Sequence, residues 1–199
     1  MTTSKTPKEQ GHAILHIRTI YERWAKFLIA TVRSPDGQTA EREIEDHGEA
    51  VCVLPYHAQR KTAILVRQMR APVLFVAGAQ ELTEAVAGVI ERGEQADACA
   101  RRETREEAGL ELRSLQHVFT GWTMPGISTE RMHFYLAVYD GEARPEVLGG
   151  LAVEHEHTIA VEFPLAELAR MADQGELVDV KTLLLLQTLR LGQPGLFVD

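Results

Sequence analysis

The sequence has very little cysteine. Cys52 and Cys99 are the only two among 199 residues, and they do not form a CxxC pair. This excludes a small scaffold held by disulfides, and it excludes a zinc site built on paired thiolates. Both cysteines have apolar or small neighbours, so we expect buried, reduced thiols. The N-terminus carries no signal-peptide pattern, and we therefore expect a cytoplasmic protein.

Long apolar runs and basic clusters are also missing. No run of 18 or more apolar residues occurs, so we expect no membrane partner. Lys and Arg number 21 against 29 Asp and Glu, a formal net charge of −8. Nucleic acid requires positive potential, so we expect no nucleic-acid partner. The hydrophobic content of 45% and charged content of 25% are typical of a globular protein.

The chain divides into three parts. Residues 1–12 are polar, and we expect a disordered tail. Residues 13–47 hold short alternating apolar segments and a Pro35–Gly37 turn, which predict a small antiparallel strand domain. Such a sheet cannot bury both faces alone, so it should pack on residues 48–199 or on a second subunit. We expect its aromatic side chains to belong to a core rather than to a ligand platform; these are Tyr21, Trp24 and Phe27.

Residues 48–199 mix strand and helix patterns. Apolar segments predict strands within 49–70 and on both sides of the loop TMPGISTE, which begins at Thr123. Two Leu-rich segments near the C-terminus predict core-facing helices. The mixture predicts an α+β fold with a mixed sheet. Pro125 and Gly126 make the loop suited to contact a substrate rather than the core.

The most informative stretch runs from Gly88 to Leu110. A glycine loop precedes a helix expected over 97–108, which Gly109 should end. Helical spacing puts three carboxylates, those of Glu103, Glu106 and Glu107, on roughly one face, where they repel one another. A bound divalent cation would compensate. Hard oxygen ligands select Mg²⁺ or Mn²⁺.

A simpler interpretation is a solvated helix face whose arginines neutralise the glutamates. The spacing around the helix argues against it. Gly88 is followed by five residues, Glu94, seven residues, Arg102-Glu103, two residues, Glu106-Glu107, one residue and Gly109-Leu110. This is the Nudix box, and the chain resembles the Nudix hydrolases. Thr104 occupies a position usually filled by an aliphatic residue.

The resemblance covers about residues 14–191 and is closest to the ADP-ribose pyrophosphatase and GDP-mannose hydrolase branch. The stretches that carry it are REIEDHG (42–48), LVRQMR (65–70), AVAGVIERGE (85–94), RRETREEAGL (101–110), PGISTER (125–131) and GLAVEHEH (150–157). It implies an α/β/α Nudix sandwich and a homodimer that exchanges the N-terminal strand domain.

The resemblance also implies the site residues. The metal ligands would be Glu103, Glu107 and the Ala87 carbonyl, joined by a glutamate from the late loop. The catalytic glutamate would be Glu154 or Glu156, and the choice stays open. Glu106 would assist the metal site, while Glu94 and Arg102 would hold the loop to the helix. The substrate-binding residues would be Arg70 for phosphate, Arg42 from the other subunit, Glu84, Pro125 and Gly126.

The expected activity is metal-dependent hydrolysis of the pyrophosphate bond of a nucleoside diphosphate sugar. ADP-ribose, giving AMP and ribose 5-phosphate, is the leading substrate, and GDP-mannose is the alternative. A nucleotide-sugar sensor that binds without hydrolysing is the competing class. Sensors commonly lose carboxylates of the box, and here none is missing, which favours catalysis.

Overall fold

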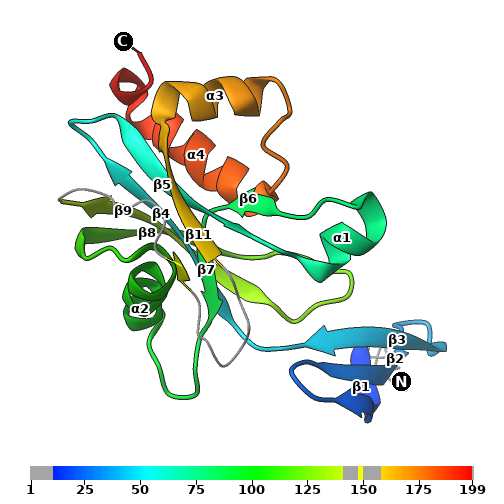
Figure 1. The fold of residues 1–199 in the computed structure, drawn as a ribbon. Helices are drawn as coiled ribbons and strands as arrows, with labels where there is room; N and C mark the ends of the chain where they lie inside the picture. The colour runs from blue at the N-terminus through cyan, green and yellow to red at the C-terminus, as the bar shows by residue number, and fades with distance from the viewer. Residues whose placement is uncertain (1–10, 141–147, 150–157, 199) are drawn as a thin grey trace, which may run out of the picture. The chain divides into compact units, whose positions relative to one another are not determined.

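The computed structural model describes residues 11–140, 148–149 and 158–198, and for 148–149 it describes the backbone only. The chain forms two compact units, Met1–Glu49 together with Trp122–Arg131, and Ala50–Gly121 together with Met132–Asp199. The elements in Figure 1 are β1 (Ala13–Glu22), β2 (Lys26–Arg33), β3 (Thr39–Asp46), β4 (Ala50–His57), β5 (Thr62–Gln68), α1 (Ala71–Ala77), β6 (Leu82–Glu84), β7 (Val86–Val89), α2 (Ala96–Ala108), β8 (Leu112–Trp122), β9 (Arg131–Tyr139), β10 (Leu148–Gly149), β11 (Thr158–Pro164), α3 (Leu165–Asp173), α4 (Val180–Gly192) and a 3₁₀ turn at Pro194–Leu196.

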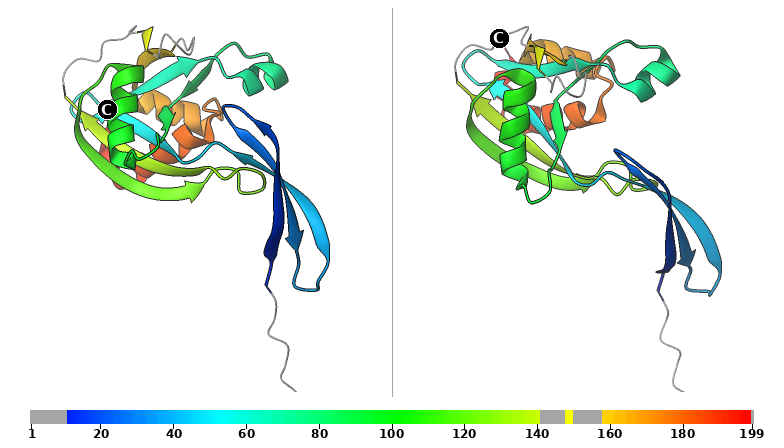
Figure 2. Two further views of the ribbon diagram at one scale, coloured as in Figure 1. Left: turned by 90° about the horizontal axis from the view of Figure 1, so that it is seen from below. Right: turned by 60° about the horizontal axis from the view of Figure 1, so that its bottom comes forward.

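The first unit is built on an antiparallel sheet of order β1-β2-β3, seen as a twisted ribbon in Figure 2. The predicted turn joins β2 to β3, and Gly37 adopts φ +87°, a value that favours glycine. The small antiparallel sheet is therefore confirmed. Tyr21, Trp24 and Phe27 do not form a core within this single chain, because these side chains are 49%, 76% and 41% exposed. Within the described part of this unit, no helix covers either face of the sheet.

The loop Trp122–Arg131 belongs to the first unit although it lies far along the chain. Glu45 and Ser128 form a parallel bridge, Glu45 N donates to Ile127 O at 2.8 Å, and Thr129 N donates to Glu45 O at 2.9 Å. The loop thus extends the hydrogen bonding at the end of β3.

The second unit is a mixed sheet of order β10-β11-β5-β4-β9-β8, with β6 paired to β5 and β7 to β4. The β4–β9 pair is parallel, whereas β4–β5, β5–β11 and β10–β11 are antiparallel. Helix α2 covers one face and α3 with α4 covers the other, as Figure 1 shows. Alternate β4 residues face the two sides: Val51 packs with Cys99 of α2, and Leu54 with Leu185 of α4. The result is an α/β/α sandwich.

Three of the four α-helices in the described residues, α2, α3 and α4, were predicted from the sequence. Helix α2 spans Ala96–Ala108 and ends at Gly109, with φ +65° and a hydrogen bond from Gly109 N to Arg105 O. The Leu-rich segments form α3 and α4, and their leucines at 165, 168, 185, 186 and 189 are buried, as predicted. Helix α1 was not predicted, and none of its residues is buried. No helix in the described ranges is long and apolar enough to cross a membrane.

Candidate active site

A strand, a glycine loop and a helix position the candidate site. Strand β7 pairs with β4, with Ala87 opposite Cys52. Gly93 then adopts φ +86° in the turn that leads to α2. The expected free thiols are confirmed: Cys52 and Cys99 are buried and form no disulfide. The Cys99 sulfur lies 3.5 Å from Val89 O, which ties the helix to the end of β7.

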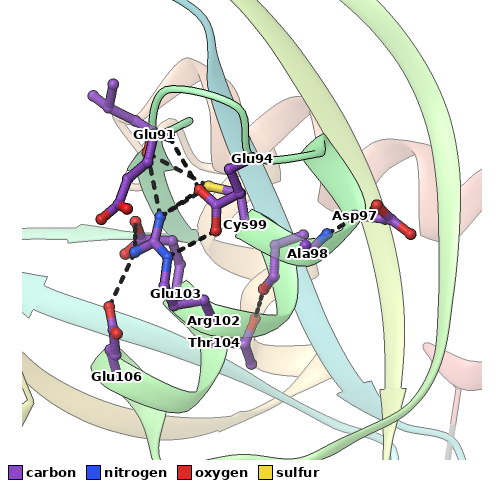
Figure 3. Close-up of polar contacts among 11 residues, drawn as sticks. Glu91, Glu94, Asp97, Ala98, Cys99, Arg102, Glu103, Thr104 and Glu106 are labelled. Carbon is purple, nitrogen blue, oxygen red and sulfur yellow. Dashed lines mark hydrogen bonds and ion pairs between the residues drawn. The ribbon is translucent and has the colours of Figure 1, made fainter.

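Arg102 forms hydrogen bonds with both the glycine loop and helix α2 (Figure 3). Its Nε and Nη2 donate to the two oxygens of Glu94, each at 2.9 Å, and Nη2 also reaches Val89 O at 3.4 Å. Its Nη1 donates to Glu103 at 2.7 Å and to Glu106 at 3.1 Å. The hydrogen bonds from Arg102 lower the pKa of Glu94 to about 2. Arg102 therefore joins the loop to the helix and offsets part of the carboxylate repulsion.

Glu103 lies directly against the backbone of Gly88. A Cβ added at Gly88 would lie 2.0 Å from both Cδ and Oε1 of Glu103. Only glycine leaves room for the carboxylate here. Burial raises the pKa of Glu103, while the charge and hydrogen bond of Arg102 act in the opposite direction. The packing holds a carboxylate beside the β7 backbone next to Ala87.

Glu107 is the most buried carboxylate of the helix, at 5% exposure. Its Oε2 accepts a hydrogen bond from Ala87 N at 3.3 Å. Burial, followed by the negative charge of Glu103, raises the pKa of Glu107 to about 8, although the Ala87 N–H and the charge of Arg70 oppose this. An ionised carboxylate is costly in such surroundings unless a cation neutralises it.

These residues fit a hard divalent cation. Glu103 and Glu107 offer carboxylate oxygens next to the Ala87 backbone, which is the donor chemistry that Mg²⁺ and Mn²⁺ prefer. Among the described residues, no group of three or more His, Cys, Asp or Glu side chains is arranged to hold a metal. Two of the expected ligands are such side chains, and a third would be Glu154 or Glu156. Both of these lie outside the described residues.

Two expected substrate-binding residues, Arg70 and Glu84, form an ion pair whose charges act on Glu107. Arg70 Nε donates to Glu84 Oε1 at 2.7 Å, and Glu84 is only 1% exposed. Lys181 Nζ donates to Glu84 Oε2 at 3.3 Å and to Asp179 Oδ1 at 2.6 Å. The buried carboxylate of Glu84 is thus paired with two cations, and it orients the Arg70 guanidinium.

Lys181 and Asp179 are site neighbours that the sequence analysis missed. Asp179 is the N-cap of α4, where it accepts from Thr182 N at 2.9 Å. The capping pattern Asp-Val-Lys-Thr was the available signal, since it marks a helix start. Nothing in its spacing connects it to Glu84, which is 97 residues from Lys181.

The other three expected substrate-binding residues share one cavity of the first unit. Arg42, Pro125 and Gly126 line a space of about 420 Å³. The remaining lining residues are Glu43, Ile44, Trp122, Ile127, Ser128 and Thr129. A lining that combines apolar side chains with the charged groups of Arg42 and Glu43 suits a planar, polar ligand such as a nucleobase.

Comparison with known proteins gives a consistent result. The family described as the NUDIX domain matches residues 46–185. A GDP-mannose pyrophosphatase of Cronobacter sakazakii is 37% identical over 160 residues, covering 78% of this chain and 82% of that protein. A GDP-mannose pyrophosphatase of Escherichia coli O1:K1 is 35% identical over 153 residues, covering 76% and 78%.

A solved structure described as an ADP compounds hydrolase superposes with a TM-score of 0.74 at 22% identity, covering 96% of this chain and 98% of that one. At that identity the likeness shows the fold, and it confirms the expected α+β class with its Nudix sandwich. The family match extends from the end of β3 into α4 and contains the whole glycine loop and helix described above. The chain belongs to the Nudix family and is a Nudix hydrolase.

Proposed function

We propose that the protein hydrolyses the pyrophosphate bond of a nucleoside diphosphate sugar, giving a nucleoside monophosphate and a sugar phosphate. The observation that carries the proposal is the pair Glu103 and Glu107, a partly buried and a buried carboxylate held beside the backbone of Gly88 and Ala87. Arg70, held by Glu84, lies close enough for its charge to act on Glu107. Carboxylates for a cation next to an oriented guanidinium suit a diphosphate.

GDP-mannose is the first substrate to test. The relatives at 35–37% identity, which this chain matches over about three quarters of its length, are GDP-mannose pyrophosphatases. ADP-ribose is the second candidate, because AVAGVIERGE and RRETREEAGL most resemble the ADP-ribose group. The two substrates share the bond that breaks and differ in base and sugar.

Nudix hydrolases generally use divalent metal ions, and we propose Mg²⁺, with Mn²⁺ as a substitute, held by Glu103, Glu107, the Ala87 carbonyl and Glu154 or Glu156. When bound, the cation neutralises the diphosphate and makes water more acidic. Glu154 or Glu156 would orient or deprotonate the attacking water. Glu106, which already shares Arg102 with Glu103, would adjust the position of Glu103.

The remaining residues would bind the substrate. Arg70 would donate to a phosphate oxygen, and Glu84 would keep its guanidinium plane in place. Arg42 would reach the substrate from the other subunit, and Pro125 and Gly126, which line the same cavity as Arg42, would also contact the substrate.

We also propose a cytoplasmic homodimer. The support for a dimer is the exposed apolar surface of the first sheet, where Ile14, Leu15, Ile17 and Ile20 of β1 are each about half exposed. The support for the cytoplasm is the pair of buried, free cysteines. Mass photometry tests the dimer, and a monomer at working concentrations would contradict it.

The deciding experiment is hydrolysis with Mg²⁺, read as phosphate released by a coupled phosphatase. GDP-mannose and ADP-ribose are compared side by side, and each is repeated after exhaustive EDTA treatment. We expect turnover of at least one substrate and its loss with EDTA. Activity that survives EDTA would contradict the metal assignment. Tight binding of a nucleotide sugar without turnover would support the sensor class instead.

A further inference from the structure

His47 lies just after β3, between two carboxylates of the first unit. Its Nδ1 is 2.5 Å from Glu45 Oε1, and its Nε2 is 2.9 Å from Glu130 Oε2. An ionised carboxylate only accepts hydrogen bonds, so both ring nitrogens can be satisfied only as donors. The geometry is that of a doubly protonated imidazolium. All three side chains are between 13% and 16% exposed, so water competes little with these bonds.

The free oxygens of the two carboxylates are held by the loop. Ser128 Oγ donates to Glu45 Oε2 at 2.6 Å, and Thr123 Oγ1 donates to Glu130 Oε1 at 2.5 Å. Ser128 Oγ also accepts from Glu130 N at 3.1 Å. Glu45 belongs to β3, and the other three residues belong to the loop. The imidazole is therefore the charged bridge between strand and loop.

The surroundings favour the charged form of the ring. Burial alone would lower the pKa of His47, but the hydrogen bonds and negative charges of Glu45 and Glu130 outweigh it, so the pKa lies above its ordinary value. The Trp24 ring stacks on the imidazole, with centroids 5.0 Å apart and planes 18° apart. Asp46 is the next acidic group on β3, and Thr129 Oγ1 donates to it at 2.6 Å. Loss of the ring proton would leave two carboxylates sharing a single N–H donor.

We propose that His47 is a positioning residue that fixes the loop Trp122–Arg131 against β3, and so fixes the cavity that Arg42, Pro125 and Gly126 line. This inference rests on the proposed function, because that cavity is where the substrate would bind. Substrate affinity then depends on the charge of a side chain that does not line the cavity. The chemical step does not depend on it.

Two variants separate charge from shape. His47→Gln keeps a side-chain donor but no charge, and it leaves one carboxylate oxygen, that of Glu45 or of Glu130, without the donor that His47 supplies. His47→Arg keeps a charged donor able to reach both carboxylates at any working pH. We expect His47→Gln to raise KM about tenfold with kcat little changed, because one charge-assisted bond is lost. In the wild type, KM should rise as the pH passes above the raised pKa of His47, because the ring then loses its charge. We expect His47→Arg to have the wild-type KM and to show no such rise.

The matched control is His16→Gln, which changes an exposed histidine of β1. It should leave KM and its pH profile as in the wild type. The proposal is overturned if His47→Gln keeps the wild-type KM, or if His47→Arg and His47→Gln have the same KM.

A second readout does not need turnover. In a Trp122→Phe background, Trp24 is the remaining tryptophan, and its fluorescence should titrate with the stacked imidazole. His47→Gln should abolish this fluorescence titration. If the titration persists in His47→Gln, the proposed role of His47 is overturned. If the wild type hydrolyses neither nucleotide sugar while Trp24 still titrates with His47, the proposed function fails and the bridge stands.

Discussion

The sharpest test of the site is Gly88→Ala. An added Cβ would lie 2.0 Å from the Glu103 carboxylate, whereas an ordinary contact is 3.4 Å or more, so the carboxylate must move by about 1.4 Å. The group that moves is the end of a flexible side chain, and alanine also restricts the unfolded chain. We therefore expect the free energy of unfolding to change by less than about 1 kcal/mol. A displacement of this size at a reacting centre costs about 100-fold in rate.

The assay measures kcat over a range of Mg²⁺ concentrations, using whichever nucleotide sugar the wild type hydrolyses, together with thermal unfolding. We expect kcat to fall about 100-fold, more Mg²⁺ to be needed for half-maximal rate, and Tm to stay nearly constant. Gly192→Ala is the matched control, because a Cβ there meets no atom within 4 Å. A Gly88→Ala enzyme with wild-type kcat and Mg²⁺ dependence would refute the role given to Glu103.

Two further predictions concern helix α2 and the loop that precedes it. Glu107→Gln should remove most turnover without lowering the Tm of the metal-free protein, since burial already disfavours the charged carboxylate; a near-wild-type rate would contradict this. Glu94→Gln should lower the free energy of unfolding by about 2 kcal/mol at neutral pH, because it breaks a bidentate bond to Arg102. The folded pKa of Glu94, about 2, lies below its ordinary 4.5, so this contribution is present above pH 4.5 and is lost as the pH falls toward 2. Urea unfolding of both proteins across this range measures it, and a constant difference would count against the ion pair.

Local signals made much of the fold predictable. Helix α2 was predictable because three signals indicate the same helix: the glycine loop before it, the helical spacing of its charged residues and the glycine that ends it. The buried leucines of α4 followed from their spacing. Helix α1 was not predicted because its sequence, APVLFVA, has no polar residues. Without alternating apolar and polar faces, the sequence shows no helical period.

The candidate site was predictable only where its residues are close in sequence. Glu103, Glu107 and Gly88 could be connected through one motif. Other contacts join residues that are far apart in the sequence. Glu84 and Lys181 are 97 positions apart, and His47 and Glu130 are 83 positions apart. No local spacing encodes such pairs. That the catalytic glutamate is Glu154 or Glu156 stays a prediction, because both residues lie outside the described part of the chain.

The loop Trp122–Arg131 has a consequence for how this protein can be divided. It lies between β8 and β9 of the second unit, yet its bonds run to β3, so the polypeptide passes between the two units three times. Deleting the N-terminal strands would remove the partners of Ser128, Thr129 and Glu130 along with the sheet. A chimaera that exchanges the first unit between relatives must therefore exchange two separate segments of the gene together.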